Sequence, residues 1–348
     1  SVTEAALLAR EVLGGTYPNP PVGAVLVRDD AVLAVGATMP CGQAHAEAVC
    51  LEQAGARARG ADLYVTLEPC AHHGRTPPCT DRIIAAGVRR VFIGCPDRNP
   101  LVNGKGIAAL RAAGIVVQEL PLPEDTVTAL YGPFFHQIRT GMPYVILKYA
   151  MTLDGKIACQ SGHARWISGT ASREFAHTLR REVHAILAGA QTIRLDDPEL
   201  TYRGGDPDPR FQPQRIVITR EGRGLAERRV FHGPDPAWIL HSGEHGRLPE
   251  DIPAFAFADG LRGCLKRLGE LGIVSLLVEG GQQVLEGFIE EDLYEELHVF
   301  VAPMLVGGQR SPLHRVLARE MGEARVLAGS WRILGDDAHY RGVRCART

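Results

Sequence analysis

The sequence has little net charge and no long apolar run, and each absence excludes a class of protein. Its 348 residues carry 38 Lys and Arg against 40 Asp and Glu, a formal net charge of −2. Without a basic surplus, we expect neither a nucleic-acid partner nor an anionic membrane surface. No apolar run approaches the roughly 18 residues of a membrane span. The first residues also lack a basic segment followed by an apolar core, so we expect no signal peptide and a cytoplasmic location.

A disulfide framework, internal repeats and low-complexity segments are also lacking. Only Cys70 and Cys79 of the eight cysteines stand in a patterned setting. We expect the others to be small apolar core residues, not the bridges of a secreted scaffold. These six are Cys41, Cys50, Cys95, Cys159, Cys264 and Cys345. No GxGxxG fingerprint of a dinucleotide-binding domain is present.

Alternating strand and helix patterns fill two predicted domains, 1–140 and 141–348. Strands are predicted in the first domain at 22–27, 32–37, 61–70, 89–95 and 115–120, and helices at 3–13, 45–55, 79–88, 104–114 and 126–139. This order predicts a largely parallel sheet. In the second domain, strands are predicted at 144–150, 184–189, 215–219, 237–240, 273–281 and 293–303, and helices at 170–182, 261–271 and 282–290. The segment 203–214 is rich in Gly, Pro and Asp, which predicts a surface loop.

A His-x-Glu pair and two cysteines indicate a zinc site in the first domain. Cys70 follows Glu-Pro at the end of a predicted strand, and Cys79 opens a predicted helix whose positive end would favour its thiolate. Imidazole and thiolate are preferred zinc ligands, and three of them leave a position for water, whose pKa zinc lowers. We predict His45, Cys70 and Cys79 as Zn²⁺ ligands. Glu47, on the same predicted helix as His45, can reach the site without being a ligand and is the predicted catalytic residue, as in zinc deaminases.

Structural explanations of the same residues stay open. Lone cysteines are more often core thiols, and a lone histidine more often lies on a helix surface. A structural zinc takes four protein ligands, and His72 or His73 could supply the fourth. The combination of residues in this order nevertheless favours the deaminase interpretation.

Several motifs resemble the bifunctional riboflavin-biosynthesis enzyme, a family that joins a deaminase to a reductase. In the first domain these are PNPPVGAVLV, HAEAVCLEQAG, YVTLEPCAHHGRTPPCTDRIIAAG and NPLVNGKGI. In the second they are PYVILKYAMTLDGKIA, RWISG, LDDPELTYR, LLVEGG and APMLVGG. The resemblance implies a cytidine-deaminase-like α/β/α domain followed by a dihydrofolate-reductase-like α/β domain.

The resemblance also implies two reactions on a small phosphorylated pyrimidine. The 2-amino group of a diaminopyrimidinone ribosylamine 5′-phosphate is hydrolysed, and NADPH then reduces the ribosyl group to ribityl. The implied substrate contacts are Asn19, His72, Arg75, Arg180, Leu200, Arg203 and Glu279, and the implied cofactor contacts are Lys148, Ala150, Trp166, Thr192 and Asp196. Gly280 and Gly281 end a predicted strand and open a helix, where a backbone can approach a phosphate. A homo-oligomer, dimer or tetramer, is a further expectation from the family.

Two positions depart from the family pattern and keep other functions open. Thr38 stands where the family usually has a His seven residues before the zinc His, and Ala164 stands where a Ser is expected to touch the substrate. One alternative is a related pyrimidine deaminase and reductase with a shifted substrate. Another is a nucleic-acid deaminase with an accessory domain, which would need a basic channel and stacking aromatics. A third is a degenerate protein that only binds a ligand.

Overall fold

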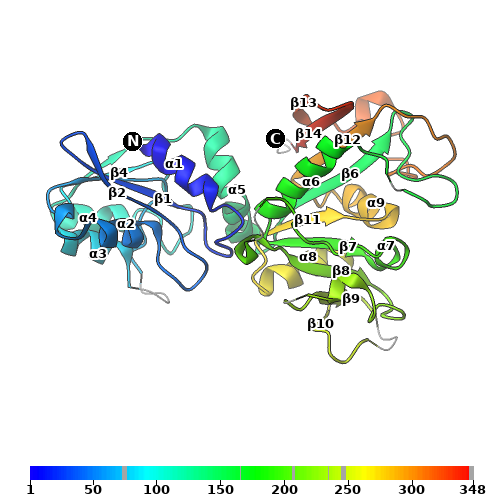
Figure 1. The fold of residues 1–348 in the computed structure, drawn as a ribbon, viewed down its shortest axis with the longest axis horizontal. Helices are drawn as coiled ribbons and strands as arrows, with labels where there is room; N and C mark the ends of the chain where they lie inside the picture. Colours follow the sequence, from blue (N-terminus) through cyan, green and yellow to red (C-terminus); the bar gives the residue numbers. More distant parts are fainter. Residues whose placement is uncertain (73–76, 165, 206–207, 234, 244–247, 345–348) are drawn as a thin grey trace. The chain divides into compact units, whose positions relative to one another are not determined.

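The computed structural model describes residues 1–72, 77–164, 166–205, 208–233, 235–243 and 248–344. It divides into two compact units, Ser1–Gly141 and Met142–Thr348, each with its own sheet and core (Figure 1). None of the helices among the described residues combines the length and apolar character that a membrane span requires.

A five-stranded sheet in the order β2-β1-β3-β4-β5 forms the centre of the first unit. The strands are β1 Gly23–Arg28, β2 Ala31–Ala37, β3 Asp62–Val65, β4 Arg90–Ile93 and β5 Val116–Glu119. Strands β3, β4 and β5 pair in parallel, whereas β1 is antiparallel to both of its neighbours, so β1 alone runs opposite to the other four strands. The predicted largely parallel sheet holds for four of the five strands, and β1 is the exception. The reason is the two-residue turn Asp29–Asp30, where both residues have positive φ and close a tight hairpin.

Five α-helices flank this sheet in the described part of the unit, and α2 brings its backbone close to it. They are α1 Val2–Glu11, α2 Ala46–Ala54, α3 Cys79–Ala86, α4 Lys105–Ala112 and α5 Glu124–Thr140. A Cβ atom on Gly36 of β2 would lie 2.3 Å from the carbonyl oxygen of Ala46. Because Gly36 has no side chain, α2 can lie directly on β2. This close packing fixes the position of the residues at the start of the helix.

A nine-stranded sheet in the order β10-β9-β8-β7-β11-β6-β12-β14-β13 forms the second unit. The strands are β6 Tyr144–Thr152, β7 Ala185–Gly189, β8 Gln214–Thr219, β9 Trp238–His241, β10 Ala254–Ala256, β11 Ser275–Glu279, β12 Glu296–Ala302, β13 Ala328–Leu334 and β14 Asp337–Val343. The run from β10 to β12 is parallel, and β14 and β13 continue it antiparallel. The helices are α6 Thr170–Glu182, α7 Ala190–Asp196, α8 Gly260–Glu270 and α9 Gln282–Glu290.

The sequence patterns did not predict β10, α7 or the β13–β14 hairpin. Strand β13 lies at the edge of the sheet with six of its seven residues exposed, so it has no alternating apolar face to detect. The expectation that the scattered cysteines are buried is confirmed for Cys50, Cys95 and Cys264. It is wrong for Cys159, which is exposed, and Cys41 is half-buried. Cys345 lies outside the described residues.

Candidate active sites

The loop-to-helix junctions of the first unit carry the predicted zinc ligands. His45 is the N-cap residue of α2, so it precedes the helix on which the sequence placed it. Glu47 lies in the first turn of α2 and is only 3% exposed. Cys79 is the first residue of α3, and its backbone N–H donates to the sulfur of Cys70 over 3.4 Å.

These three side chains converge on one point. His45 Nδ1 lies 3.7 Å from the sulfur of Cys70 and 3.3 Å from that of Cys79, and all three candidate ligand atoms lie within 4.8 Å of one another. Tetrahedral zinc with ordinary Zn–N and Zn–S bonds separates such atoms by about 3.5–3.8 Å. The donor set and its spacing therefore fit zinc, with Nδ1 as the imidazole ligand.

The electrostatics of this cluster favour a thiolate at Cys70. A hydrogen bond from the Cys79 side chain, a second from His45 and the Cys79 backbone N–H together lower the pKa of Cys70 to about 4. The pKa of Cys79 is raised, chiefly by Cys70 and by burial. The backbone N–H of Cys79 at the start of α3 points at the Cys70 sulfur, so the positive end of this helix also favours a thiolate at Cys70, beside the one predicted at Cys79. Burial and the nearby Cys70 raise the pKa of Glu47.

Glu68, which the sequence analysis did not single out, anchors the loop that carries Cys70. It is 3% exposed, and its carboxylate accepts four backbone N–H bonds at the start of α4 and in the loop before it. The donors are Asp97 at 3.3 Å, Gly104 at 3.1 Å, Gly106 at 3.0 Å and Ile107 at 3.2 Å. A Cβ on Gly106 would lie 2.0 Å from the carbonyl oxygen of Pro69, so the motif NPLVNGKGI packs directly on the cysteine loop.

A second buried carboxylate, Asp97, was also missed. Burial is the main reason that its pKa is raised to about 6, and the charges of Glu68 and Cys70 add to this, whereas His72 lowers it. Asp97 is thus close enough to interact electrostatically with Cys70, one of the predicted zinc ligands, and with His72, an exposed residue predicted to contact the substrate. Asn19, half-buried, donates its backbone N–H to Thr16 O at 3.0 Å. Arg75 lies outside the described residues.

In the second unit, three predicted site residues form a buried ion cluster. Arg180 of α6 makes two parallel bonds of 2.8 Å to the carboxylate of Glu279, at the end of β11. Lys148 of the adjacent strand β6 lies 3.9 Å from the same carboxylate. Burial alone would raise the pKa of Glu279, but Arg180 and Lys148 lower it to about 2. Burial lowers the pKa of Lys148. The Glu279 carboxylate is therefore firmly ionised between two basic side chains, Arg180 and Lys148.

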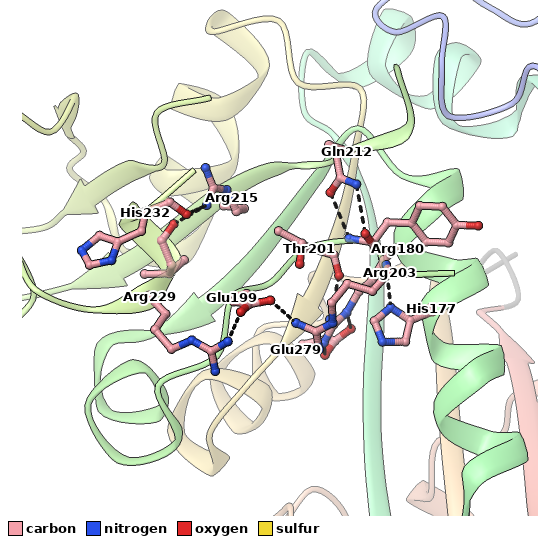
Figure 2. Close-up of polar contacts among 12 residues, drawn as sticks. His177, Arg180, Glu199, Thr201, Arg203, Gln212, Arg215, Arg229, His232 and Glu279 are labelled. Atoms are coloured by element: carbon pink, nitrogen blue, oxygen red, sulfur yellow. Dashed lines mark hydrogen bonds and ion pairs between the residues drawn. The ribbon is translucent and has the colours of Figure 1, made fainter. Parts of the chain in front are cut away.

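Leu200 and Arg203 belong to the segment 199–203, which contacts this cluster (Figure 2). Arg180 Nη1 donates to Thr201 O at 3.0 Å. Arg203 Nη1 lies 2.5 Å from Glu199, and Leu200 is buried with φ of 54°. The structure therefore brings Lys148, Arg180 and Glu279 together and sets the segment with Arg203 beside them.

A cavity of about 1060 Å³ lies where β7, β8 and β11 end. Thr192 of α7 and Gly281, the N-cap of α9, both line it, and the Gly281 N–H donates to the Thr192 hydroxyl at 2.7 Å. The carboxyl edge of parallel strands is the usual ligand site of open α/β sheets.

The remaining predicted cofactor residues lie outside the described lining of this cavity. They are Lys148, Ala150, Trp166, Asp196 and Gly280. Trp166 is 68% exposed, and the Arg173 guanidinium lies 4.7 Å from its ring centroid. In the turn after β6, the Asp154 carboxylate accepts the N–H groups of Val306 and Gly307.

Comparison with known proteins matches both units. Residues 1–95 match the cytidine and deoxycytidylate deaminase zinc-binding region, and residues 143–335 match the RibD C-terminal domain. The riboflavin biosynthesis protein RibD of Aquifex aeolicus is 40% identical over 86% of this chain and 85% of its own length. The chain belongs to the RibD family. RibD of Bacillus amyloliquefaciens is 41% identical over 88% of this chain and 84% of its own.

Solved RibD structures share the whole fold. That of Acinetobacter baumannii (form 1) superimposes with a TM-score of 0.91 at 34% identity, covering 99% of this chain and 98% of that one. A Thermotoga maritima diaminohydroxyphosphoribosylaminopyrimidine deaminase/5-amino-6-(5-phosphoribosylamino)uracil reductase gives 0.87 at 34% identity over 99% and 97%. The first unit is accordingly a deaminase domain of the zinc-binding type and the second a RibD reductase domain, which confirms the predicted fold class and family.

Proposed function

We propose that this bifunctional RibD protein catalyses two consecutive steps of riboflavin biosynthesis. The first is hydrolytic deamination of 2,5-diamino-6-ribosylamino-4(3H)-pyrimidinone 5′-phosphate. The second is NADPH-dependent reduction of the ribosyl side chain, which gives 5-amino-6-(5-phosphoribitylamino)uracil. The observation that carries the first reaction is the convergence of His45, Cys70 and Cys79 next to the buried Glu47.

In the deaminase domain, His45, Cys70 and Cys79 would hold zinc, and Glu47 would move protons. When bound, zinc supplies Lewis-acid activation of a water molecule. Glu47 lies at the start of α2 in a buried position, where a carboxyl group can accept a proton and pass it to the pyrimidine and then to the departing ammonia. Asn19, His72 and Arg75 would orient the substrate.

In the reductase domain, Arg180 and Glu279 of the ion cluster would hold the substrate, and the cavity that Thr192 and Gly281 line would hold part of NADPH. When bound, NADPH supplies the hydride for the reduction. Glu279 offers carboxylate oxygens to the ribosyl hydroxyls while Arg180 and Lys148 keep it ionised. Arg203 and the backbone at Leu200 would bind the phosphate end, and Thr192, Gly280 and Gly281 would bind the cofactor with Lys148, Ala150, Trp166 and Asp196.

The variant Glu47→Gln tests the assignment of the first reaction. It keeps the shape of the buried side chain but removes the group that accepts protons, so ammonia release should fall by at least ~100-fold. NADPH oxidation with supplied 5-amino-6-(5-phosphoribosylamino)uracil should not change. Glu52→Gln, on the exposed side of the same helix, is the matched control. Loss of both activities in Glu47→Gln, or of neither, would refute separate sites with Glu47 as the proton carrier.

We further infer a cytoplasmic homo-oligomer built through the reductase domain. The edge strand β13 supports the oligomer, because Trp331 is 64% and Ile333 73% exposed on a sheet edge that no other described strand covers. Sedimentation of the intact protein should give at least a dimer, and Trp331→Glu should shift it toward the monomer. A wild-type protein that sediments as a monomer at micromolar concentration would contradict the inference.

A further inference from the structure

His177 connects two elements that carry predicted substrate residues, yet neither the motifs nor the family comparison assigns it a role. It lies on α6, three residues before Arg180. Its ring nitrogen Nδ1 accepts a hydrogen bond from the backbone N–H of Arg203 at 3.3 Å (Figure 2). Residues three apart on a helix share a face, so His177 and Arg180 approach the segment 199–203 together.

This hydrogen bond fixes the tautomer of the imidazole ring. A backbone N–H can only donate, so Nδ1 carries no proton and Nε2 carries the one proton of the neutral ring. Burial, followed by the charges of Arg180 and Arg203, lowers the pKa of His177 to about 4. The ring is therefore neutral near pH 7, with a single N–H donor at Nε2. Within the described part of the chain, Nε2 makes no hydrogen bond.

The segment 199–203 does not depend on His177 alone for its conformation. Gln212 binds both backbone groups of Tyr202, accepting from its N–H at 3.1 Å and donating to its carbonyl at 2.9 Å. Glu199 pairs with Arg203 and with Arg229. What His177 adds is a hydrogen bond that holds the backbone of Arg203 (Figure 2), while the Nε2–H on the other edge of its ring is left to donate elsewhere.

The charge around His177 favours an anion. Arg180, Arg203 and Lys148 all contribute positive potential at the ring, whereas Glu279 is the acidic group that acts on it. Glu279 is already paired with Arg180, and the Arg203 side chain is about half exposed. An imidazole donor, an exposed guanidinium and surplus positive charge together form a suitable environment for a phosphate group.

Resting on the proposed function, we propose that His177 determines the specificity of the reductase for a 5′-phosphorylated substrate. Nδ1 holds the backbone of Arg203, and Nε2–H donates to a phosphate oxygen beside the Arg203 guanidinium. His177 is thus a binding and positioning residue, and it takes no proton during the reaction.

Two substitutions separate these two roles. His177→Asn puts an amide oxygen near the position of Nδ1, which keeps the acceptor for Arg203 and removes the Nε2 donor. His177→Gln puts an amide nitrogen near the position of Nε2, which keeps the donor. His232→Asn makes the same chemical change at an exposed histidine of the same domain and serves as the control. The stability of each variant is followed by tryptophan fluorescence during urea unfolding.

The assay is NADPH oxidation with the phosphorylated aminouracil ribosylamine and with its dephosphorylated counterpart. For His177→Asn we expect KM for the phosphorylated substrate to rise roughly tenfold or more, which is the cost of losing one hydrogen bond to a charged group. Its kcat, and its KM for the dephosphorylated substrate, should stay unchanged. His177→Gln should recover most of the preference for phosphate.

Other outcomes would overturn the inference. Equal losses on both substrates, or a fall in kcat at constant KM, would leave His177 only a structural role. An unchanged KM in His177→Asn would remove the phosphate contact. If the wild-type protein oxidises NADPH with neither substrate, the proposed function itself fails, and this result is distinct from any difference between the variants.

Discussion

Replacing Glu68 with Gln should destabilise the deaminase domain selectively. The Glu68 carboxylate accepts four buried backbone N–H bonds, two on each oxygen: Gly106 and Ile107 on Oε1, Asp97 and Gly104 on Oε2. A glutamine side chain has only one oxygen. Whichever way the amide is turned, its NH₂ group faces two N–H donors, so two hydrogen bonds are lost and the other two lose their charge assistance.

The size of the effect follows from these bonds. A hydrogen bond to a charged group contributes ~1.5–3 kcal/mol, and an ordinary one ~0.5–1.5 kcal/mol. Losing two charged bonds and weakening two others should therefore lower the free energy of unfolding by roughly 3–5 kcal/mol, which is at the upper end for single substitutions. This is a large share of the ~5–15 kcal/mol that stabilises a typical domain.

Probes for the two domains can be separated because all three tryptophans, Trp166, Trp238 and Trp331, lie in the reductase domain. Tryptophan fluorescence during urea unfolding therefore reports only that domain. Pulse alkylation of the buried Cys50, read by mass spectrometry of its peptide, reports the deaminase domain. Glu68→Gln should lower the urea midpoint of Cys50 alkylation by at least ~1 M and leave the fluorescence midpoint unchanged.

The control is Glu119→Gln, which removes an exposed carboxylate from β5 of the same domain. Both Cys50 and tryptophan midpoints should then match the wild type. If Glu68→Gln behaves like this control, the four N–H bonds do not stabilise the loop around the metal cluster. If the Cys50 alkylation midpoint and the tryptophan fluorescence midpoint fall together, the two domains do not unfold as separate units, and the predicted selective effect on the deaminase domain is wrong.

Two further predictions concern the reductase domain. A lysine in Arg180→Lys cannot form the two-bond pair with Glu279, so KM for the reductase substrate should rise about tenfold or more. Ammonia release by the deaminase domain should stay unchanged. Equal KM values for the variant and the wild type would contradict the role of the pair. Burial would raise the pKa of Glu296, but His298 and Arg341 lower this pKa from 4.5 to about 2. The ionised Glu296 therefore stabilises the fold above pH 4.5, and this stabilisation is lost as the pH falls toward 2. Glu296→Gln should therefore be less stable than wild type at pH 7, by tryptophan fluorescence, with the difference vanishing near pH 2; a difference independent of pH would refute this.

The metal cluster could be predicted from the sequence because each ligand stands in a short motif with its own chemistry. His45 and Glu47 lie within one three-residue stretch of the chain, and Cys70 and Cys79 stand at the two ends of one loop. Glu68 could not be found in the same way. Its hydrogen-bond donors lie 29 to 39 residues further along the chain, and nothing in Leu-Glu-Pro marks a carboxylate that accepts backbone N–H groups. The glycines of the distant run, Gly104 and Gly106, indicate a close backbone approach but do not name Glu68 as its partner.

In the reductase domain, the sequence predicted site residues without showing their partners. Arg180 and Glu279 are 99 positions apart and meet because β11 is paired with β6 and β7 beneath α6. Gln212 lies in a segment predicted to be only a surface loop, whereas it binds Tyr202 and adjoins the buried Phe211. Loop composition indicates turns and exposure, but it carries no information about contacts made with a distant segment.

Thr38 shows how a departure from the family pattern can leave the fold unchanged. Its hydroxyl accepts the Val22 N–H at 3.0 Å, and its own N–H donates to the Val22 carbonyl at 2.9 Å. Thr38 is only 4% exposed, so its side chain serves the backbone that leads from Asn19 into β1. A hydroxyl held in this way cannot reach as far as an imidazole ring at the same position. The predicted zinc ligand His45 and Glu47 follow within nine residues, at the start of α2, and the direct packing of α2 on Gly36 of β2 sets their position independently of the Thr38 side chain.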